Sequence, residues 1–475
     1  MIRLRNILWG FAALMGTVVA ARFLMGPTVV GGFSVTTPAN PEGFLGLGIT
    51  ILLLWHSGGR VLTRAIHSDG RAEWALAATV AVLAMAAFSP GLTFYFLSDD
   101  FILIKMATQW DSARLVPLFT SPGGDGFFRP FGYLSLAFTA SWAGSTPWLW
   151  HIPALAANAL NATLVTLLAR RLGVGRLGAL VAGALFAVHG THPEAVVWIA
   201  GRFDMLATVF SLGCLLLFRR STWGALLCCL PALLSKESAY VLPALLTLLA
   251  VYERRAPRET LPFWGLATAA FAYRWFLFGG IGGYTIAGRP QFFALGLAST
   301  LKALFVRLWT SLYFPLNWSV EPGWVLMLLA VAYIGTLLWL TSRPRYNGPA
   351  WVGFAGLLIS MLPALHLFNG APDLAGGRLL YLPSVWFCVM LGSSMEGLGK
   401  RAGMIVAAIV LAFHFTALWH NLDRWENASE RVRITCEGVA RGAIVAEEHP
   451  GYIQGVPGLA NGFAECVELA SRPLQ

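Results

Sequence analysis

Apolar segments long enough to cross a bilayer recur along nearly the whole chain, and short clusters of arginine and lysine separate them. This repetition constrains the fold more than any other feature, because a segment in lipid must satisfy its own backbone hydrogen bonds. Composition points the same way, since 57% of the 475 residues are hydrophobic, 12% are charged and the mean hydropathy is +0.66. Too little polar surface remains for a soluble protein of this size. The sequence therefore predicts an all-α polytopic membrane protein.

The distribution of basic residues sets the orientation of these segments. The net charge is +10, but the cations are dispersed between apolar segments instead of gathered on one polar face, which argues against a nucleic-acid partner. With the basic clusters kept in the cytoplasm, the chain crosses the membrane about thirteen times. Beyond two N-terminal crossings, the predicted spans are residues 74–96, 151–168, 177–188, 203–218, 223–234, 239–252, 261–278, 324–340, 351–367, 379–391 and 404–419.

The same topology divides the chain into three parts. Residues 1–73 form two extra N-terminal transmembrane helices, at 7–25 and 44–55, of which the first is retained and not cleaved as a signal peptide. Residues 74–420 form the transmembrane core, whose first external loop, 97–150, carries amphipathic helices in the membrane interface. Residues 292–314 are re-entrant or interfacial, and residues 421–475 form a small extracytoplasmic tail.

Two adjacent carboxylates, Asp99 and Asp100, follow the apolar segment that ends at Leu97. Acidic side chains at the mouth of a span are costly to keep near lipid and mark functional sites. We interpret the pair as a source of a general base on the outer face of the membrane. Capping of the next helix is the alternative interpretation, although one acid suffices for that role.

Further polar residues fall on the same side of the membrane and are candidates for binding a polar sugar and a phosphate. These residues are Arg129, His189, His192, Glu194, Arg202, Asp204, Lys236 and Arg378. Structural roles stay open for several of them, as a snorkelling arginine, as helix-end residues or as ion pairs among the acidic and basic members. The sequence predicts no metal site and no other cofactor, although these carboxylates and histidines leave a divalent metal open.

Four strings of residues carry a resemblance to a known family. They are Phe128-Arg129-Pro130 with Leu134-Ser135, residues 189–204 with their His189, Glu194, Arg202 and Asp204, Leu234-Ser235-Lys236-Glu237, and residues 378–384 beginning at Arg378. Together they resemble the GT-C glycosyltransferases, and among these the tetratricopeptide-bearing O-mannosyltransferases and their bacterial relatives. The chain departs from that family at Gly190 and Gly377, and no tetratricopeptide repeats follow Trp425.

This resemblance implies a GT-C fold and an inverting transfer of a sugar from a polyprenyl-phosphate donor to a protein hydroxyl, glycan or lipid acceptor. It favours Asp99 as the base and Arg378, with Arg202 and Lys236, as ligands of the lipid phosphate. The implied location is a bacterial inner membrane, with the site facing the periplasm. In that compartment Cys436 and Cys466 can form a disulfide.

Two other classes of protein compete with this interpretation. A secondary transporter or flippase for an anionic solute or lipid would place ionisable groups near the middle of its spans and repeat its halves, and the sequence has neither feature. A non-catalytic scaffold subunit would use the polar residues only to retain a partner.

Overall fold

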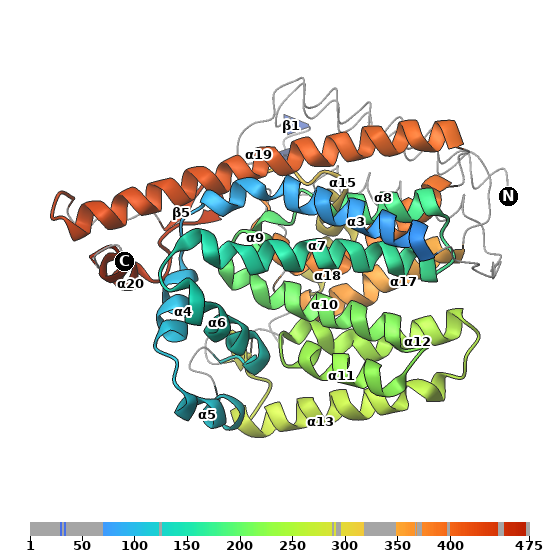
Figure 1. Ribbon diagram of the computed structural model, residues 1–475, viewed down its shortest axis with the longest axis horizontal. Coiled ribbons are helices and arrows are strands. Elements are labelled where there is room, and N and C mark those ends of the chain that lie inside the picture. Colours follow the sequence, from blue (N-terminus) through green and yellow to red (C-terminus); the bar gives the residue numbers. More distant parts are fainter. Residues whose placement is uncertain are drawn as a thin grey trace.

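The computed structural model describes residues 29–30, 33–34, 70–122, 126–286, 289–290, 296–317, 348–365, 367, 373–396, 400–444 and 451–471. Three predicted spans, at residues 7–25, 44–55 and 324–340, lie outside these ranges. Within them the protein is a bundle of helices with only short two-residue strands (Figure 1). The prediction of an all-α fold is confirmed.

The helices that form the bundle follow the apolar segments closely. Their bounds are α3 Gly70–Ala87, α7 Pro147–Arg171, α8 Arg176–Ala187, α10 Arg202–Leu217, α11 Thr222–Leu233, α12 Leu242–Tyr252, α13 Leu261–Phe278, α17 Gly348–Met361, α18 Tyr381–Glu396 and α19 Lys400–Ala440. Short 3-10 turns precede or extend several of them, at η1 Ser89–Thr93, η3 Ile199–Gly201, η4 Glu237–Val241, η5 Pro257–Thr260, η8 Leu362–Ala364 and η9 Gly377–Leu380.

Helix α18 is the centre of the bundle, since it is buried from Tyr381 to Met395. It packs against α8, α17, α10, α7 and α19, while α3 packs on α7 and α8, and α11 packs on α10. Small residues permit the closest approach: a Cβ atom at Gly178 of α8 would lie 2.6 Å from the carbonyl oxygen of Gly392 in α18. Such contacts between small residues are typical of helices packed within a membrane.

Four helical stretches in the described ranges are long and apolar enough to cross a membrane, and five shorter apolar helices accompany them. Large apolar side chains point outward from the peripheral helices, as Val82 of α3, Trp223 and Leu227 of α11, and Phe276 of α13 do. An outward-facing apolar surface of this kind suits contact with lipid. The prediction of a multi-pass membrane protein is confirmed.

The two ends of the bundle differ in charge. Arginine and lysine clusters lie at one end, at residues 170–176, 219–220, 254–258 and 400–401, and Arg171 pairs there with Glu253 at 2.9 Å. The loops at the other end carry Asp99, His189, Lys236 and Arg378. The polar residues singled out in the sequence therefore gather at a single end of the bundle.

The described residues between 97 and 146 form short helices beside that end, and their location in the membrane interface stays a prediction. They are α4 Asp99–Thr108, η2 Ser112–Arg114, α5 Leu115–Thr120 and α6 Pro130–Ala143, with α9 Pro193–Val196 nearby in the following loop. The ambiguous segment 292–314 contains one continuous helical stretch, α14 Leu297–Lys302, a π-turn at Ala303–Arg307 and α15 Leu308–Tyr313. The residues of α15 are buried.

Helix α19 has 41 residues and is therefore about 62 Å long, roughly twice the thickness of a bilayer core. It continues without a break through residue 420, where the sequence suggested the start of a separate tail. After it come β5 Tyr452–Ile453, β6 Val456–Pro457 and α20 Phe463–Ala470, and Figure 1 shows α20 below the far end of α19, near α4. Two further strand pairs, β1 Val29–Val30 with β2 Phe33–Ser34 and β3 Thr285–Ile286 with β4 Arg289–Pro290, are antiparallel.

Candidate active site

A cavity of about 690 Å³ opens at the polar end of the bundle, and four residues predicted from the sequence line it: Asp99, Arg129, Lys236 and Arg378. Its apolar wall comes mainly from α4, α5 and α6. A second cavity of about 280 Å³ shares the three cations and adds Asp204, Glu237 and Arg274. The cationic side chains thus stand at a boundary that both cavities reach.

The two adjacent acids at the start of α4 have different surroundings. The side chain of Asp99 is partly exposed in the cavity, where its Oδ1 accepts a hydrogen bond from Nδ2 of Asn461 at 2.7 Å. Asp100 is only 1% exposed and accepts from the backbone N–H groups of Leu97 (3.2 Å) and Ala200 (3.0 Å). Burial raises the pKa of the Asp100 carboxyl well above its ordinary value. Of the two acids, only Asp99 lines the cavity. Asp100 instead links the turn at Leu97 to the loop at Ala200 through its two hydrogen bonds.

Arg129 and Arg274 share one carboxylate. Nη2 of Arg129 lies 2.7 Å and its Nε 3.0 Å from Oε2 of Glu237, while Nη1 of Arg274 lies 2.7 Å from Oε1. The Arg129 guanidinium also lies 3.9 Å from the ring centroid of Phe127. These contacts fix the orientation of both guanidinium groups, because both donate to the Glu237 carboxylate, and Oε1 also accepts from Nε of Arg129 at 3.3 Å.

Lys236 forms a buried ion pair with Asp204 at the start of α10. The two side chains are 9% and 5% exposed. Burial lowers the pKa of Lys236 to about 8, although Asp204 stabilises the ammonium form. Lys236 is therefore a cation that titrates close to neutral pH.

Arg378 stands in the η9 turn that begins at Gly377, where a Cβ atom would lie 2.9 Å from the carbonyl oxygen of Thr191. Its backbone N–H donates to Oε2 of Glu194 at 3.2 Å, and its Nε lies 3.5 Å from Oε1. The guanidinium lies 4.4 Å from the ring centroid of Trp198. Burial raises the pKa of Glu194, against the effect of Arg378. Glu194 and Trp198 together hold Arg378 at the cavity.

Arg202 does not line either cavity, contrary to its predicted role as a phosphate ligand. It is 2% exposed, and it donates to Oγ1 of Thr139 and to the carbonyl oxygen of Trp150, each at 2.7 Å. These bonds join α10 to α6 and α7. Both Nη atoms of Arg202 are thus bound to protein groups between helices, and its role as a phosphate ligand stays a prediction.

His189 and His192 also lie away from both cavities, so the geometry does not support donor binding by these residues. Both are fully buried: Nδ1 of His189 lies 2.9 Å from Oγ1 of Thr191, and Nε2 of His192 lies 2.9 Å from Oγ of Ser384. Burial lowers the pKa of His189 to about 3, and it lowers that of His192 as well. In the parts of the chain described by the structure, no group of three His, Cys, Asp or Glu residues is arranged to hold a metal ion.

Four residues of the site were absent from the predicted set. Glu237 and Arg274 were visible in the sequence as charges in apolar contexts, but nothing placed them at the cavity. Trp198 lay within the string at residues 189–204 but was given no role, and Asn461 carried no local signal, since each acts through a side chain distant in sequence.

Comparisons with known proteins identify local relatives. No family model matches the chain. Protein O-mannosyl-transferase Tmtc1 of Drosophila melanogaster is 40% identical over 125 residues, which cover 25% of this chain and 15% of that protein. Tmtc2 of the same fly is 36% identical over 91 residues, or 19% and 10% of the two chains. TMTC2 of Homo sapiens is 31% identical over 116 residues, or 22% and 14%.

Among solved structures, the chain is similar to ArnT from Cupriavidus metallidurans in the apo state. It has 14% sequence identity and a TM-score of 0.35, with 84% of this chain and 85% of that chain covered. A score of this size does not establish a shared arrangement of helices. The O-mannosyltransferases are matched over at most 15% of their length. Over that local segment, the resemblance to GT-C protein O-mannosyltransferases that the motifs indicated is confirmed.

Proposed function

We propose that the protein is an integral-membrane glycosyltransferase that moves a sugar from a polyprenyl-phosphate donor to an acceptor hydroxyl, with inversion. One observation carries the proposal: Asp99 and three braced cations, Arg129, Lys236 and Arg378, line one cavity at the polar end of the bundle. The local similarity to O-mannosyltransferases supports transfer of a sugar. The acceptor is a protein hydroxyl, a glycan or a lipid.

The balance of charge around the two cavities supports a phosphodiester ligand. The cavity walls and their bracing groups hold five cations, Arg114, Arg129, Lys236, Arg274 and Arg378, and four carboxylates, Asp99, Glu194, Asp204 and Glu237. One positive charge remains, and a sugar joined to a lipid through one phosphate carries one negative charge. Because a buried charge is costly without a partner, a site with this surplus favours an anionic ligand.

The reaction divides the residues into two roles. A carboxylate oxygen of Asp99 takes the proton of the acceptor hydroxyl, whose oxygen forms the new bond to the anomeric carbon. The bond from that carbon to the phosphate oxygen breaks on the opposite face, and the lipid phosphate leaves with the electron pair. Arg129, Lys236 and Arg378 stabilise the negative charge that develops on the phosphate.

We place the cavity on the outer side of a bacterial inner membrane, facing the periplasm. The basic clusters lie at the opposite end of the bundle, as the positive-inside rule requires for a cytoplasmic end. The Cys436–Cys466 disulfide lies at the same end as the cavity, which suits an oxidising compartment. We propose that residues 74–420 contain the catalytic core, although the predicted boundary at 420 lies inside α19 and the external C-terminal part begins within that helix.

The test separates donor binding from chemistry. In nanodiscs, the protein is titrated with undecaprenyl phosphate, the lipid product, and is assayed for transfer from radiolabelled undecaprenyl-phosphate sugars to membrane extracts of a strain lacking the gene. We expect Asp99→Asn to bind the lipid and transfer nothing, and Arg378→Ala to bind at least tenfold more weakly. Arg220→Ala, an exposed arginine at the opposite end, serves as the control.

Three results would contradict the proposal. Full transfer by Asp99→Asn would remove the proposed base. Lipid flux across proteoliposomes without a new glycosidic bond would favour the transporter. Variants that change only the retention of a partner protein would favour the scaffold.

A further inference from the structure

The last described segment, residues 451–471, forms a small cap that packs on α4, the helix that carries Asp99. We call this segment the C-terminal cap. It consists of the β5–β6 hairpin and α20. Two acidic side chains of α20 hold Lys105 of α4, with Nζ at 2.9 Å from Oε2 of Glu468 and 3.7 Å from Oε1 of Glu465. The cap therefore contacts α4 along its length, and its contacts continue at the first turn.

The residue before Asp99 has an unusual backbone conformation that the cap encloses. Ser98 has φ +47°, a region that residues other than glycine rarely adopt. Its N–H donates to the carbonyl oxygen of Gly458 at 2.8 Å, and its own carbonyl oxygen lies against Gly462, where a Cβ atom would approach to 2.6 Å. A conformation of this kind persists only where surrounding contacts hold it. At Ser98 the cap supplies the two contacts just described, beside the local bond from the Phe101 N–H to the Ser98 carbonyl oxygen at 3.3 Å.

The cap also reaches the carboxylate itself. Nδ2 of Asn461 donates to Oδ1 of Asp99 at 2.7 Å, and both side chains line the large cavity. Each carboxylate oxygen has two lone pairs, so this bond leaves both oxygens able to accept a proton. What the amide holds is the direction in which the carboxylate faces the cavity.

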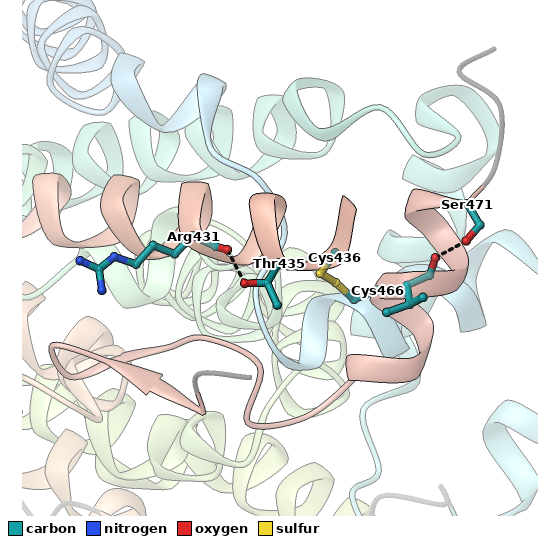
Figure 2. The surroundings of a disulfide bond; sticks show 6 residues. Arg431, Thr435, Cys436, Cys466 and Ser471 are labelled. Atoms are coloured by element: carbon teal, nitrogen blue, oxygen red, sulfur yellow. Dashed lines mark hydrogen bonds between the residues drawn. A yellow bond between two sulfur atoms is a disulfide. The ribbon is translucent and has the colours of Figure 1, made fainter. Parts of the chain in front are cut away.

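A disulfide fastens the cap to the bundle. Cys466 of α20 is bonded to Cys436 in the last turns of α19, and their Cα atoms lie 5.8 Å apart (Figure 2). The chain has six cysteines, and the other four are reduced. A reductant therefore has this bond as its only disulfide target.

We propose that the C-terminal cap is a wall of the active site and that Asn461 is a positioning residue, which holds Asp99 for proton removal while the Cys436–Cys466 bond keeps the cap in place. The inference rests on the proposed glycosyl transfer for its kinetic consequences. Its structural part, the hold on Ser98 and Asp99, is independent of any substrate.

Hydrogen exchange tests the structural part without an activity assay. The protein in nanodiscs is compared with and without tris(2-carboxyethyl)phosphine, and amide exchange is followed in residues 97–101, with residues 254–260 at the opposite end as the control. We expect exchange in 97–101 to become at least about tenfold faster on reduction and that of the control to stay the same. Unchanged exchange in 97–101 would overturn the proposal.

Kinetics test the positioning role through three variants at two exposed side chains, Asn461 and Asn427. We expect Asn461→Ala to lower kcat about tenfold and to leave the donor KM within twofold, because Asn461 contacts Asp99 and none of the cations. Asn461→Asp keeps the shape of the side chain and loses the N–H that donates to Asp99. If Asn461 only packs, this variant should keep the wild-type kcat. If Asn461 positions Asp99, its kcat should fall at least as far as that of Asn461→Ala. Asn427 donates to the exposed Asp423 at 3.2 Å, and Asn427→Ala is the matched control.

The two proposals fail in different ways. Asn461→Ala or Asn461→Asp with kcat within twofold of the wild type, beside an inactive Asp99→Asn, would overturn the positioning role and leave the glycosyltransferase intact. A wild-type protein that transfers no sugar would refute the proposed function, and the exchange result would still decide whether the cap holds Asp99. The double variant Asn461→Ala/Cys466→Ser should have a kcat no lower than that of the more impaired single variant, because both changes act through the Asp99 carboxylate.

Discussion

Replacement of each acid at the start of α4 should separate stability from catalysis. Asp100→Ala leaves the buried N–H groups of Leu97 and Ala200 without their acceptor. Each such group costs about 1–3 kcal/mol, so the pair costs about 4 kcal/mol. With an unfolding entropy of roughly 2.1 cal/mol/K per residue over 475 residues, the melting temperature should fall by about 4 °C. Asp99→Ala loses one exposed hydrogen bond, and its melting temperature should stay within about 1 °C of the wild type.

The assay is thermal unfolding in nanodiscs beside sugar transfer at 25 °C. Asp100→Asn retains one acceptor oxygen, so it should lose about half as much as Asp100→Ala. Asp99→Ala should be inactive, while Asp100→Ala should keep measurable transfer below its melting temperature. The reasoning is refuted if Asp100→Ala has the melting temperature of the wild type, or if Asp99→Ala lowers the melting temperature as much as Asp100→Ala does.

Three further predictions concern the cations and the packing. Arg378→Gln should raise the donor KM about tenfold or more in steady-state kinetics, with Arg220→Gln unchanged, because a phosphate ligand is lost. Since the pKa of Lys236 is lowered to about 8, its charge is present below pH 8 and lost above it. The donor KM should therefore rise from pH 7 to 9, and a profile that is equally steep in Lys236→Arg would contradict this assignment. Gly356→Ala should lower the melting temperature, because its Cβ would lie 2.3 Å from the Trp386 ring; unchanged melting would show that the helices can separate.

The helices were predictable because each leaves a strong local pattern. The apolar segment at residues 261–278 coincides with α13, and 223–234 differs from α11 by one residue at each end. The position of polar residues at one end was predictable from the basic clusters alone, since loop charge alternates with each crossing. The continuation of α19 past residue 420, where we predicted a boundary between core and tail, was not predictable, because the change from apolar to polar composition occurs within one helix.

The roles of individual polar residues were less accessible. Adjacent residues of a helix point about 100° apart, so Asp99 can face the cavity while Asp100 faces the interior, a choice that composition does not show. Arg202 looked like a phosphate ligand, but its partners, Thr139 and the Trp150 carbonyl, lie 63 and 52 residues earlier. Asn461 lies 362 residues from Asp99, and only the folding of the cap onto α4 reveals it. Pairings at that separation depend on tertiary packing.

The central claim is that one chamber holds the lipid phosphate against three cations with Asp99 at its open side. Electron cryomicroscopy of the protein in nanodiscs saturated with undecaprenyl phosphate tests it most directly. The account predicts head-group density in contact with Arg129, Lys236 and Arg378, within the cavity that Asp99 lines. Head-group density at the end that carries Arg219 and Arg220, or a chamber left without lipid at saturation, would contradict it.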